Sequence, residues 1–217
     1  MYQPPHFQET RLEVLHSLIR QHPLGLLICN GAHGPVANPL PFLLNAEEGA
    51  KGVLLAHLSR ANPQWQLIGS QPDMPVAVVF QGADSYVTPS WYETKKQTGK
   101  VVPTWNYAMV QARGRATIIE DAAWLRAQIT ELTATQEASR AEPWHVSDAP
   151  DAFIAGQVKG IVGIRIEISD LQGKWKVSQN RPASDREGVA RGLGAMDDEA
   201  SQTMAGLVER YSRPDRD

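Results

Sequence analysis

The chain has 217 residues, of which 42% are hydrophobic and 21% are charged, the balance of a globular protein with a buried core. Its formal net charge of −3 excludes an overall basic field that would draw the protein onto nucleic acid or anionic lipid. Because Cys29 is the single cysteine, an internal disulfide and a cysteine cluster for zinc are excluded as well.

Residues 8–20 are predicted to form an amphipathic helix. Thr10 and Glu13 have the spacing of a capping box, apolar residues follow at helical intervals, and Pro23 ends the segment. Short apolar runs follow, separated by glycine, proline and asparagine, at 24–30, 36–45, 52–58, 75–82, 85–92 and 107–120. Short strands at this spacing indicate a closed or nearly closed antiparallel β-barrel, so we expect a mainly β fold of the α+β class.

Two helices are expected between or after these strands. Asn62 and Pro63 form a typical helix start, with Asn62 as the cap and Pro63 in the first helical position. Asp121 begins a second helical stretch that runs to about Ser139. Residues 138–153 are then expected to be a loop, because prolines interrupt them.

The last part of the chain is predicted to contain a strand pair and helices. The strands are expected at 160–169 and 173–180, joined by residues 170–172. Ser184 and Glu187 have capping-box spacing ahead of an amphipathic C-terminal helix. We expect one domain over residues 1–217, with a helical and loop insertion at 121–155 and a C-terminal helical extension at 183–217.

The segment AHLSRANPQW, residues 56–65, has the features of an anion site. The amide groups at a helix start favour an anion, and Ser59 adds a hydroxyl. Arg60 adds a guanidinium that can bind two phosphate oxygens at once. The alternative is that Arg60 is a solvated surface charge and Ser59 a turn residue. The segment lacks the glycines of a P-loop, so hydrolysis of nucleoside triphosphates is not indicated.

Aromatic residues gather in one part of the chain. Of its six tryptophans and five tyrosines, five fall between residues 86 and 107. They are Tyr86, Trp91, Tyr92, Trp105 and Tyr107. Such rings gather where a flat ligand or a partner surface is contacted, whereas packing in the core or at the barrel edge is the alternative for each ring.

The segment GKWKVSQNRP, residues 173–182, places donors at the end of a strand. Lys174 and Lys176 alternate with apolar residues and therefore share one face of the strand. Gln179, Asn180 and Arg181 follow where the strand ends. This set suits recognition of ring carbonyls or phosphate, and solvation at the surface is the alternative.

Motifs of several other protein classes are missing from the sequence. The histidines show no HxxxH or histidine–carboxylate spacing that would indicate a metal, and there is no GxSxG, paired-carboxylate pattern or GxGxxG after a strand. We find no convincing helix-turn-helix pattern. Hydrolases, metalloenzymes and a dedicated DNA-reading module are therefore disfavoured.

Seven segments, spread over nearly the whole chain, carry a resemblance to a known family. They are MYQPPHF at the start, HPLGLLI at 22–28, LPF at 40–42, HLSRANPQW at 57–65, SYVTPSWY at 85–92, KVVPTWNYAMVQARG at 100–114 and GKWKVSQNRPASDREGVARGL at 173–193. In this order they resemble the PaiB family, whose members are described as FMN-binding negative transcriptional regulators.

The resemblance implies a split antiparallel β-barrel, related to pyridoxamine-phosphate-oxidase-like proteins, with N-terminal, middle and C-terminal helices. FMN would lie between the two subunits of a homodimer. The residues implied at the cofactor are Asn38, Pro39 and Leu40, then Ala56, His57, Leu58, Ser59, Arg60 and Asn62, then Trp105 and Asn106, and, from the partner subunit, Lys176, Gln179 and Arg181. No catalytic residue and no metal ligand is implied.

The resemblance also implies a repressor-like regulator that senses flavin or redox state. The alternative is an FMN-dependent oxidoreductase or flavin reductase of the same fold, because FMN carries redox chemistry by itself. DNA is a conceivable partner that neither charge nor motif supports. The sequence shows no basic-then-apolar leader and no long apolar run, so we expect a cytoplasmic protein without a membrane span.

Overall fold

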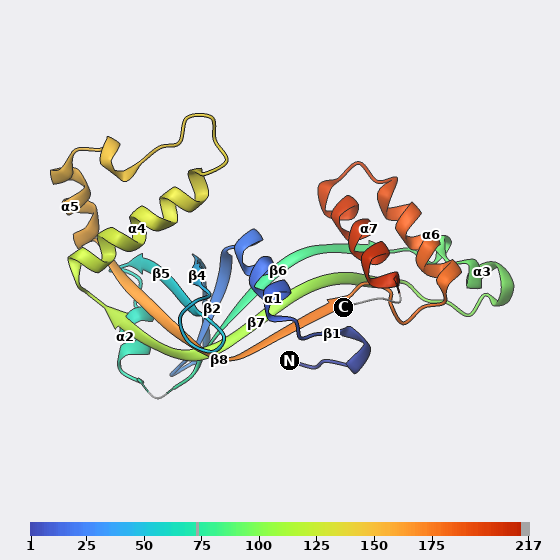
Figure 1. The fold of residues 1–217 in the computed structure, drawn as a ribbon. Helices are drawn as coiled ribbons and strands as arrows, with labels where there is room; N and C mark the ends of the chain where they lie inside the picture. The colour runs from blue at the N-terminus through green and yellow to red at the C-terminus, as the bar shows by residue number, and fades with distance from the viewer. Residues whose placement is uncertain (73, 214–217) are drawn as a thin grey trace. The chain divides into compact units, whose positions relative to one another are not determined.

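The computed structural model describes residues 1–72 and 74–213 (Figure 1). Its strands are β1 Gln8–Glu9, β2 Leu24–Gly31, β3 Gly34–Pro41, β4 Leu43–Asn45, β5 Val53–Ser59, β6 Val76–Val87, β7 Thr104–Ile119 and β8 Ile161–Lys176. Its α-helices are α1 Leu12–Gln21, α2 Gln64–Gly69, α3 Glu93–Thr98, α4 Ala122–Glu137, α5 Asp151–Lys159, α6 Ala183–Gly194 and α7 Glu199–Ser212. Short 3-10 helices are η1 Pro5–Phe7, η2 Pro89–Trp91 and η3 Val146–Asp148.

The strands form one antiparallel sheet in the order β3-β2-β6-β7-β8-β5-β4, and β1 pairs with β8 off this path. The fold is therefore of the predicted α+β class. The chain divides into two compact units. Unit 1 comprises Met1–Leu18, Gln81–Val110 and the described residues from Gln172 onward, and unit 2 comprises Ile19–Phe80 without residue 73 and Gln111–Leu171. The expected single domain, with its insertion and extension, stays a prediction.

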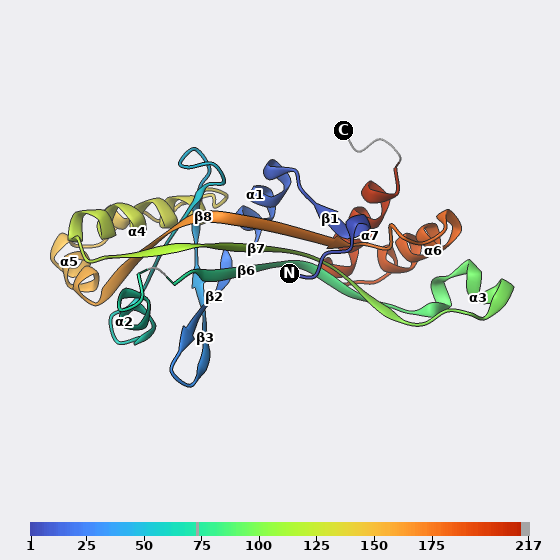
Figure 2. The same cartoon turned by 90° about the horizontal axis from the view of Figure 1, so that it is seen from below.

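The core of unit 2 is formed by strands that bury one face. In β8 the buried residues alternate as the sequence predicts: Val162, Ile164, Ile166 and Ile168. Glu167 between them is exposed. A second, smaller apolar cluster lies under α4 and α5 and consists of Leu125, Val146, Ile154 and Val158. The helices α4 and α5 lie side by side in Figure 1 and in Figure 2.

Unit 1 contains the helices α6 and α7, which pack on each other, and α6 also packs on η2. Two glycines permit the close approach of α6 to η2. A Cβ on Gly188 would lie 2.0 Å from the carbonyl oxygen of Trp91, and a Cβ on Gly192 would lie 2.3 Å from the Trp91 ring. The chain start is attached by the pairing of β1 with β8 and by a hydrogen bond from the Tyr211 hydroxyl to Glu9 Oε2 at 2.5 Å, and Glu9 also forms an ion pair with Arg11.

Several predicted element boundaries are wrong. The first helix begins at Leu12 rather than at residue 8, because Gln8 and Glu9 pair with β8. The stretch 36–45 is split between β3 and β4. The runs 75–82 and 85–92 form a single strand, β6, which ends at Val87 before η2. The segment 93–98, which lies between two of the predicted strands, is the helix α3.

Further corrections concern the C-terminal half. The strand pair at 160–169 and 173–180 is one continuous strand, β8, without a turn at 170–172. The end of the predicted loop 138–153 is wrong, because Pro150 is the N-cap of α5 rather than a break. The Ser184 capping box is wrong too, since Pro182 is the N-cap of α6 and Ser184 lies inside the helix. By contrast, Asp121 caps α4 as predicted, its carboxylate accepting a hydrogen bond from the Trp124 amide at 2.8 Å.

In the described part of the chain, none of the helices combines the length and the apolar character needed to traverse a bilayer.

Candidate functional site

The residues singled out in the sequence fall into two sets, one in each unit. The unit 2 set comprises Asn38, Pro39 and Leu40 on β3 together with residues 56–60 and Asn62. The unit 1 set comprises Trp105 and Asn106 on β7, Lys176 at the end of β8, and the loop residues Gln179 and Arg181. The geometry of each set follows separately.

Lys176 is the half-buried cation at the centre of the unit 1 set. Its ammonium group donates to Thr104 Oγ1 at 2.5 Å and to the carbonyl oxygen of Trp105. Burial lowers the pKa of Lys176, and the positive charges of Lys174 and Arg181 lower it further. Lys174, Lys176 and Arg181 are called the cationic cluster below.

The cationic cluster lacks a carboxylate partner. No ion pair among the described residues involves any of its three members. Lys174 is buried and contacts π-faces instead, its Nζ lying 5.4 Å from the ring centres of Tyr2 and Tyr107. Arg181 lies over the Tyr92 ring at 4.7 Å. The cluster thus holds positive charge that an anionic ligand would neutralise.

Beside this cluster the unit exposes two aromatic rings. Trp105 is 54% exposed and Tyr86 is 49% exposed, and their rings meet edge to face with centres 6.1 Å apart. The backbone carbonyl oxygen of Trp105 accepts a hydrogen bond from the ammonium group of Lys176. Tyr92, from the same aromatic-rich region, is buried instead, so the region supplies both core and surface. Trp105 and Tyr86, the aromatic pair, offer a flat apolar surface next to a cation.

Asn106 and Gln179 shape the turn that follows β8. Asn106 is 1% exposed and donates from Nδ2 to Ser178 Oγ at 2.9 Å. Ser178 has a positive φ of 66°, a backbone conformation that non-glycine residues rarely adopt. Gln179 accepts from the Val177 amide at 2.8 Å and donates to the carbonyl of Trp175 at 2.5 Å. Both side chains therefore hold the turn in place and orient its neighbours.

In the unit 2 set, the turn after β5 uses its own polar side chains. Ser59 Oγ accepts from the Ala61 amide at 3.2 Å, and Asn62 Oδ1 accepts from the Gln64 amide at 3.0 Å. The predicted helix start is one residue too early: Pro63 rather than Asn62 is the N-cap, and α2 begins at Gln64 and has only six residues. A helix this short adds little dipole, so an anion here would depend mainly on Arg60.

Arg60 is held by several partners. Its Nη1 forms an ion pair with Glu120 at 2.5 Å, and Nε and Nη2 donate to the carbonyls of Lys159 and Ile161 at 3.3 and 3.4 Å. The guanidinium also lies 5.8 Å from the centre of the Trp65 ring. A phosphate at Arg60 would therefore compete with the carboxylate of Glu120.

The other members of the unit 2 set differ in the groups that they could present to a ligand. The side chains of Leu40, Ala56 and Leu58 are buried in the core, so only their backbone groups could contact a ligand. Asn38 donates to Gln64 Oε1 at 2.9 Å. His57 is half-buried, and its Nδ1 lies 2.8 Å from Gln128 Oε1.

Sequence reasoning missed the polar residues that position these side chains. They are Gln64, Thr104, Gln128 and Ser178. Gln128 could have been found, because it lies three residues after Leu125 and four before Leu132 and so falls on the buried face of α4. A polar residue on such a face needs a buried partner. Thr104 and Ser178 carry no comparable signal.

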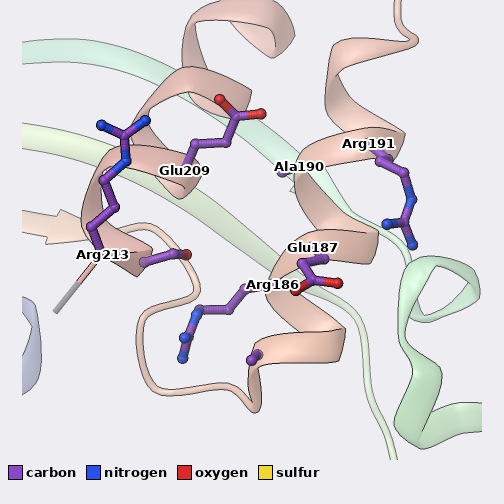
Figure 3. A pocket seen from close by; sticks show the side chains of 8 residues that line it. Arg186, Glu187, Ala190, Arg191, Glu209 and Arg213 are labelled. Carbon is purple, nitrogen blue, oxygen red and sulfur yellow. The ribbon is translucent and has the colours of Figure 1, made fainter.

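Two hollows are lined mostly by residues outside the predicted sets. Figure 3 shows a pocket of about 530 Å³ between α6 and α7, where Arg186, Arg191 and Arg213 alternate with Glu187 and Glu209. Its mixed charges favour no single ligand class. A second hollow, of about 490 Å³, lies between α4 and α5 and includes Arg60. No group of three or more metal-binding side chains is found in the part of the chain that the structure describes.

The chain is similar to known proteins over most of its length. Residues 1–170 match the family described as "Putative FMN-binding domain". The chain is 37% identical to "Uncharacterized protein AN0679" of Emericella nidulans, over 96% of each chain. It is 30% identical to "Protease synthase and sporulation protein PAI 2" of Bacillus subtilis, over 96% of this chain and 97% of that protein.

A solved structure with the same fold is the FAD and heme binding protein from Mycobacterium smegmatis. It is 19% identical, with a TM-score of 0.56 over 78% of this chain and 73% of that one. At this identity the likeness concerns the fold alone. Together with the antiparallel sheet, it confirms the split-barrel architecture predicted from the sequence.

Proposed function

Because the chain belongs to the FMN-binding domain family and is related to the PaiB regulator, we propose that it is a homodimeric, flavin-dependent transcriptional regulator. FMN is its cofactor. The observation that carries the proposal is the cationic cluster, which lies beside the aromatic pair and forms no ion pair in the part of the chain that the structure describes.

The unit 1 set fits FMN by its chemistry. FMN combines a flat ring with a negatively charged phosphate. The aromatic pair offers a surface for the ring, and Lys176 beside it offers a positive charge that forms no ion pair among the described residues. When bound, FMN supplies the redox chemistry, and the protein supplies position and electrostatics.

The unit 2 set fits the phosphate under one condition. Arg60 is a suitable phosphate ligand, because a guanidinium can form two parallel hydrogen bonds with an oxyanion. It is engaged by Glu120, so the phosphate must replace or share that carboxylate. Within this proposal His57, Ser59 and Asn62 line the same end of β5.

A second copy of the chain would complete the cofactor site. The resemblance implies that FMN lies between subunits. Unit 1 exposes Trp105, Tyr86 and Val102, three large apolar side chains on or next to its strands. Exposed apolar surface of this kind marks contact sites. Light scattering of the purified protein should give the mass of a dimer, and a monomer at micromolar concentration would contradict this part.

The second part of the proposal is the role in regulating transcription. It follows from the relationship to PAI 2, named for protease synthesis and sporulation. With a net charge of −3, the protein is expected to act on transcription mainly through a partner protein. A mobility-shift assay with promoter fragments at low salt tests direct DNA contact, and a sequence-specific shift would show that no partner is needed.

An FMN-dependent oxidoreductase is the second candidate, and Lys176 is the observation that favours it. A fixed ammonium group beside the ring would stabilise the negative charge that the flavin gains on reduction. Anaerobic mixing with NADH or NADPH separates the candidates. Bleaching of the bound flavin at a catalytic rate would support the enzyme, whereas an unchanged flavin spectrum with both nucleotides would remove it.

A further inference from the structure

A hollow between α4 and α5 in unit 2 has no role in the proposed FMN site apart from sharing Arg60. It has a volume of about 490 Å³, within the range of small-molecule sites. The residues that line it are Arg60, Glu120, Ala122, Ala123, Leu125, Arg126, Ala155, Val158 and Lys159. We call it the α4–α5 cavity.

The cavity exists because small side chains face it. Leu125 and Val158 belong to the apolar cluster that holds α4 against α5, and they form its floor. Ala122, Ala123 and Ala155 each contribute only a Cβ, so the two helices leave space above the cluster that their side chains do not fill. The result is an apolar hollow with a firmly packed base.

The rim of the cavity is charged and mainly cationic. Arg60 is paired with Glu120 at 2.5 Å, and Arg126 is paired with Asp151 at 2.5 Å. Lys159 lines the same rim, and no ion pair among the described residues involves its ammonium group. The ammonium group of Lys159 is therefore available to an anionic group that lies above the apolar floor of the cavity.

We propose that the α4–α5 cavity binds a small amphipathic acid, with its apolar body on Leu125 and Val158 and its carboxylate at Lys159. The apolar lining selects a hydrocarbon or aromatic body, because burying that surface is favourable. The cationic rim selects a negative head group over a neutral one. Binding does not require FMN, so the proposal stands or falls separately from the cofactor site.

Octanoate and 1-octanol are the probes that test this inference. Their binding to the FMN-free protein is measured by backbone NMR titration. We expect octanoate to shift amides of residues 122–126 and 155–159, and to bind about tenfold more tightly than 1-octanol. Lys159→Gln should abolish the preference for the acid. Equal binding of both probes, or no shifts in these segments, would overturn the proposal.

Two neighbouring positions on α5 provide a matched control. Ala155 lines the cavity, whereas a Cβ on Gly156 would meet nothing within 4 Å. Ala155→Phe should fill the cavity and remove octanoate binding, while Gly156→Phe places the same ring in open space and should leave binding intact. Unchanged binding in Ala155→Phe, with the fold preserved by circular dichroism, would place the probe elsewhere and contradict the assignment.

Discussion

The side-chain oxygen of Gln128 on α4 lies 2.8 Å from Nδ1 of His57 on β5, although 71 positions separate the two residues in the sequence. An amide oxygen only accepts hydrogen bonds, so Nδ1 of His57 is the donor and carries the proton. The other ring nitrogen, Nε2, is then a hydrogen-bond acceptor while the ring is neutral. An acceptor suits an N–H of the flavin ring better than a phosphate oxygen. Gln128 is 3% exposed, so the partner that it offers His57 is buried.

Gln128→Leu removes the group that selects the His57 tautomer. We expect nitrogen NMR to show a proton mainly on Nδ1 in the parent protein and a mixture of tautomers in the variant. FMN affinity should fall about three- to tenfold, the size of one neutral hydrogen bond. Gln136→Leu, an exposed change on the same helix, is the control. A proton on Nε2 in the parent protein would contradict the assignment.

A pair of variants tests the phosphate role of Arg60. Arg60→Ala should weaken FMN binding by about 1.5–3 kcal/mol, the range for a hydrogen bond to a charged group. Glu120→Gln removes the competing carboxylate and should strengthen FMN binding. Isothermal titration measures both. If Arg60 only supports the turn after β5, Arg60→Ala would leave FMN affinity unchanged and Glu120→Gln would not raise it.

The ion pair near the chain start predicts how unfolding depends on pH. Burial alone would raise the pKa of Glu9, but hydrogen bonds from Arg11 and Tyr211 outweigh it and hold the pKa at about 2, against an ordinary value of 4.5. A lowered pKa gives stability that is complete above pH 4.5 and lost as the pH falls toward 2. This contribution is roughly 2–3 kcal/mol.

Urea unfolding of Glu9→Gln checks that prediction. The variant should lose most of this contribution at pH 7 and show a flatter pH profile between 4.5 and 2. Glu13→Gln, an exposed glutamate on α1, should change little. Burial and the negative charge of Glu9 raise the pKa of Tyr211, so stability should also fall above pH 10, and less so in Tyr211→Phe.

The contact between α6 and η2 predicts a strong effect of a single methyl group. In Gly188→Ala the Cβ would lie 2.0 Å from the Trp91 carbonyl oxygen, which belongs to the backbone and cannot rotate away. We expect a loss of about 1–3 kcal/mol in unfolding free energy. Gly206→Ala on α7 has open space and should gain roughly 0.5–1 kcal/mol through helix propensity. Thermal unfolding of both variants measures these changes. A Gly188→Ala variant as stable as the parent protein would refute the close contact.

The sequence predicted strands well where the apolar pattern was local. Val162, Ile164 and Ile166 alternate with polar or small residues, and the burial of β8 follows them. It failed at Asp170, Leu171 and Gln172, which have turn-like composition but lie within β8. In the sheet β8 lies between β7 and β5, and partners so far away in the sequence are not visible in a local window.

The same difference between local and long-range signals holds for the candidate site. The position of Arg60 at a strand end could be predicted, because strand length and turn residues are local signals. The pattern places Lys176 inside a strand at 173–180, whereas it is the last residue of β8. The partners of both residues could not be predicted: Glu120 is 60 positions from Arg60, and Thr104 is 72 positions from Lys176. Pairing over such distances depends on the strand order, which single-sequence patterns do not determine.

Binding of FMN beside Lys176 can be tested by a fluorescence titration of FMN against the FMN-free protein. We expect the parent protein to saturate at one FMN per chain. For Lys176→Met, which keeps the length of the side chain and removes its charge, we expect about ten- to hundredfold weaker binding. Lys51→Met serves as the control and should bind like the parent, because Lys51 is a half-buried lysine of unit 2 whose ammonium group donates to the carbonyl oxygen of Ser169. A protein that takes up no FMN, or a Lys176→Met variant with the affinity of the parent, would contradict the account.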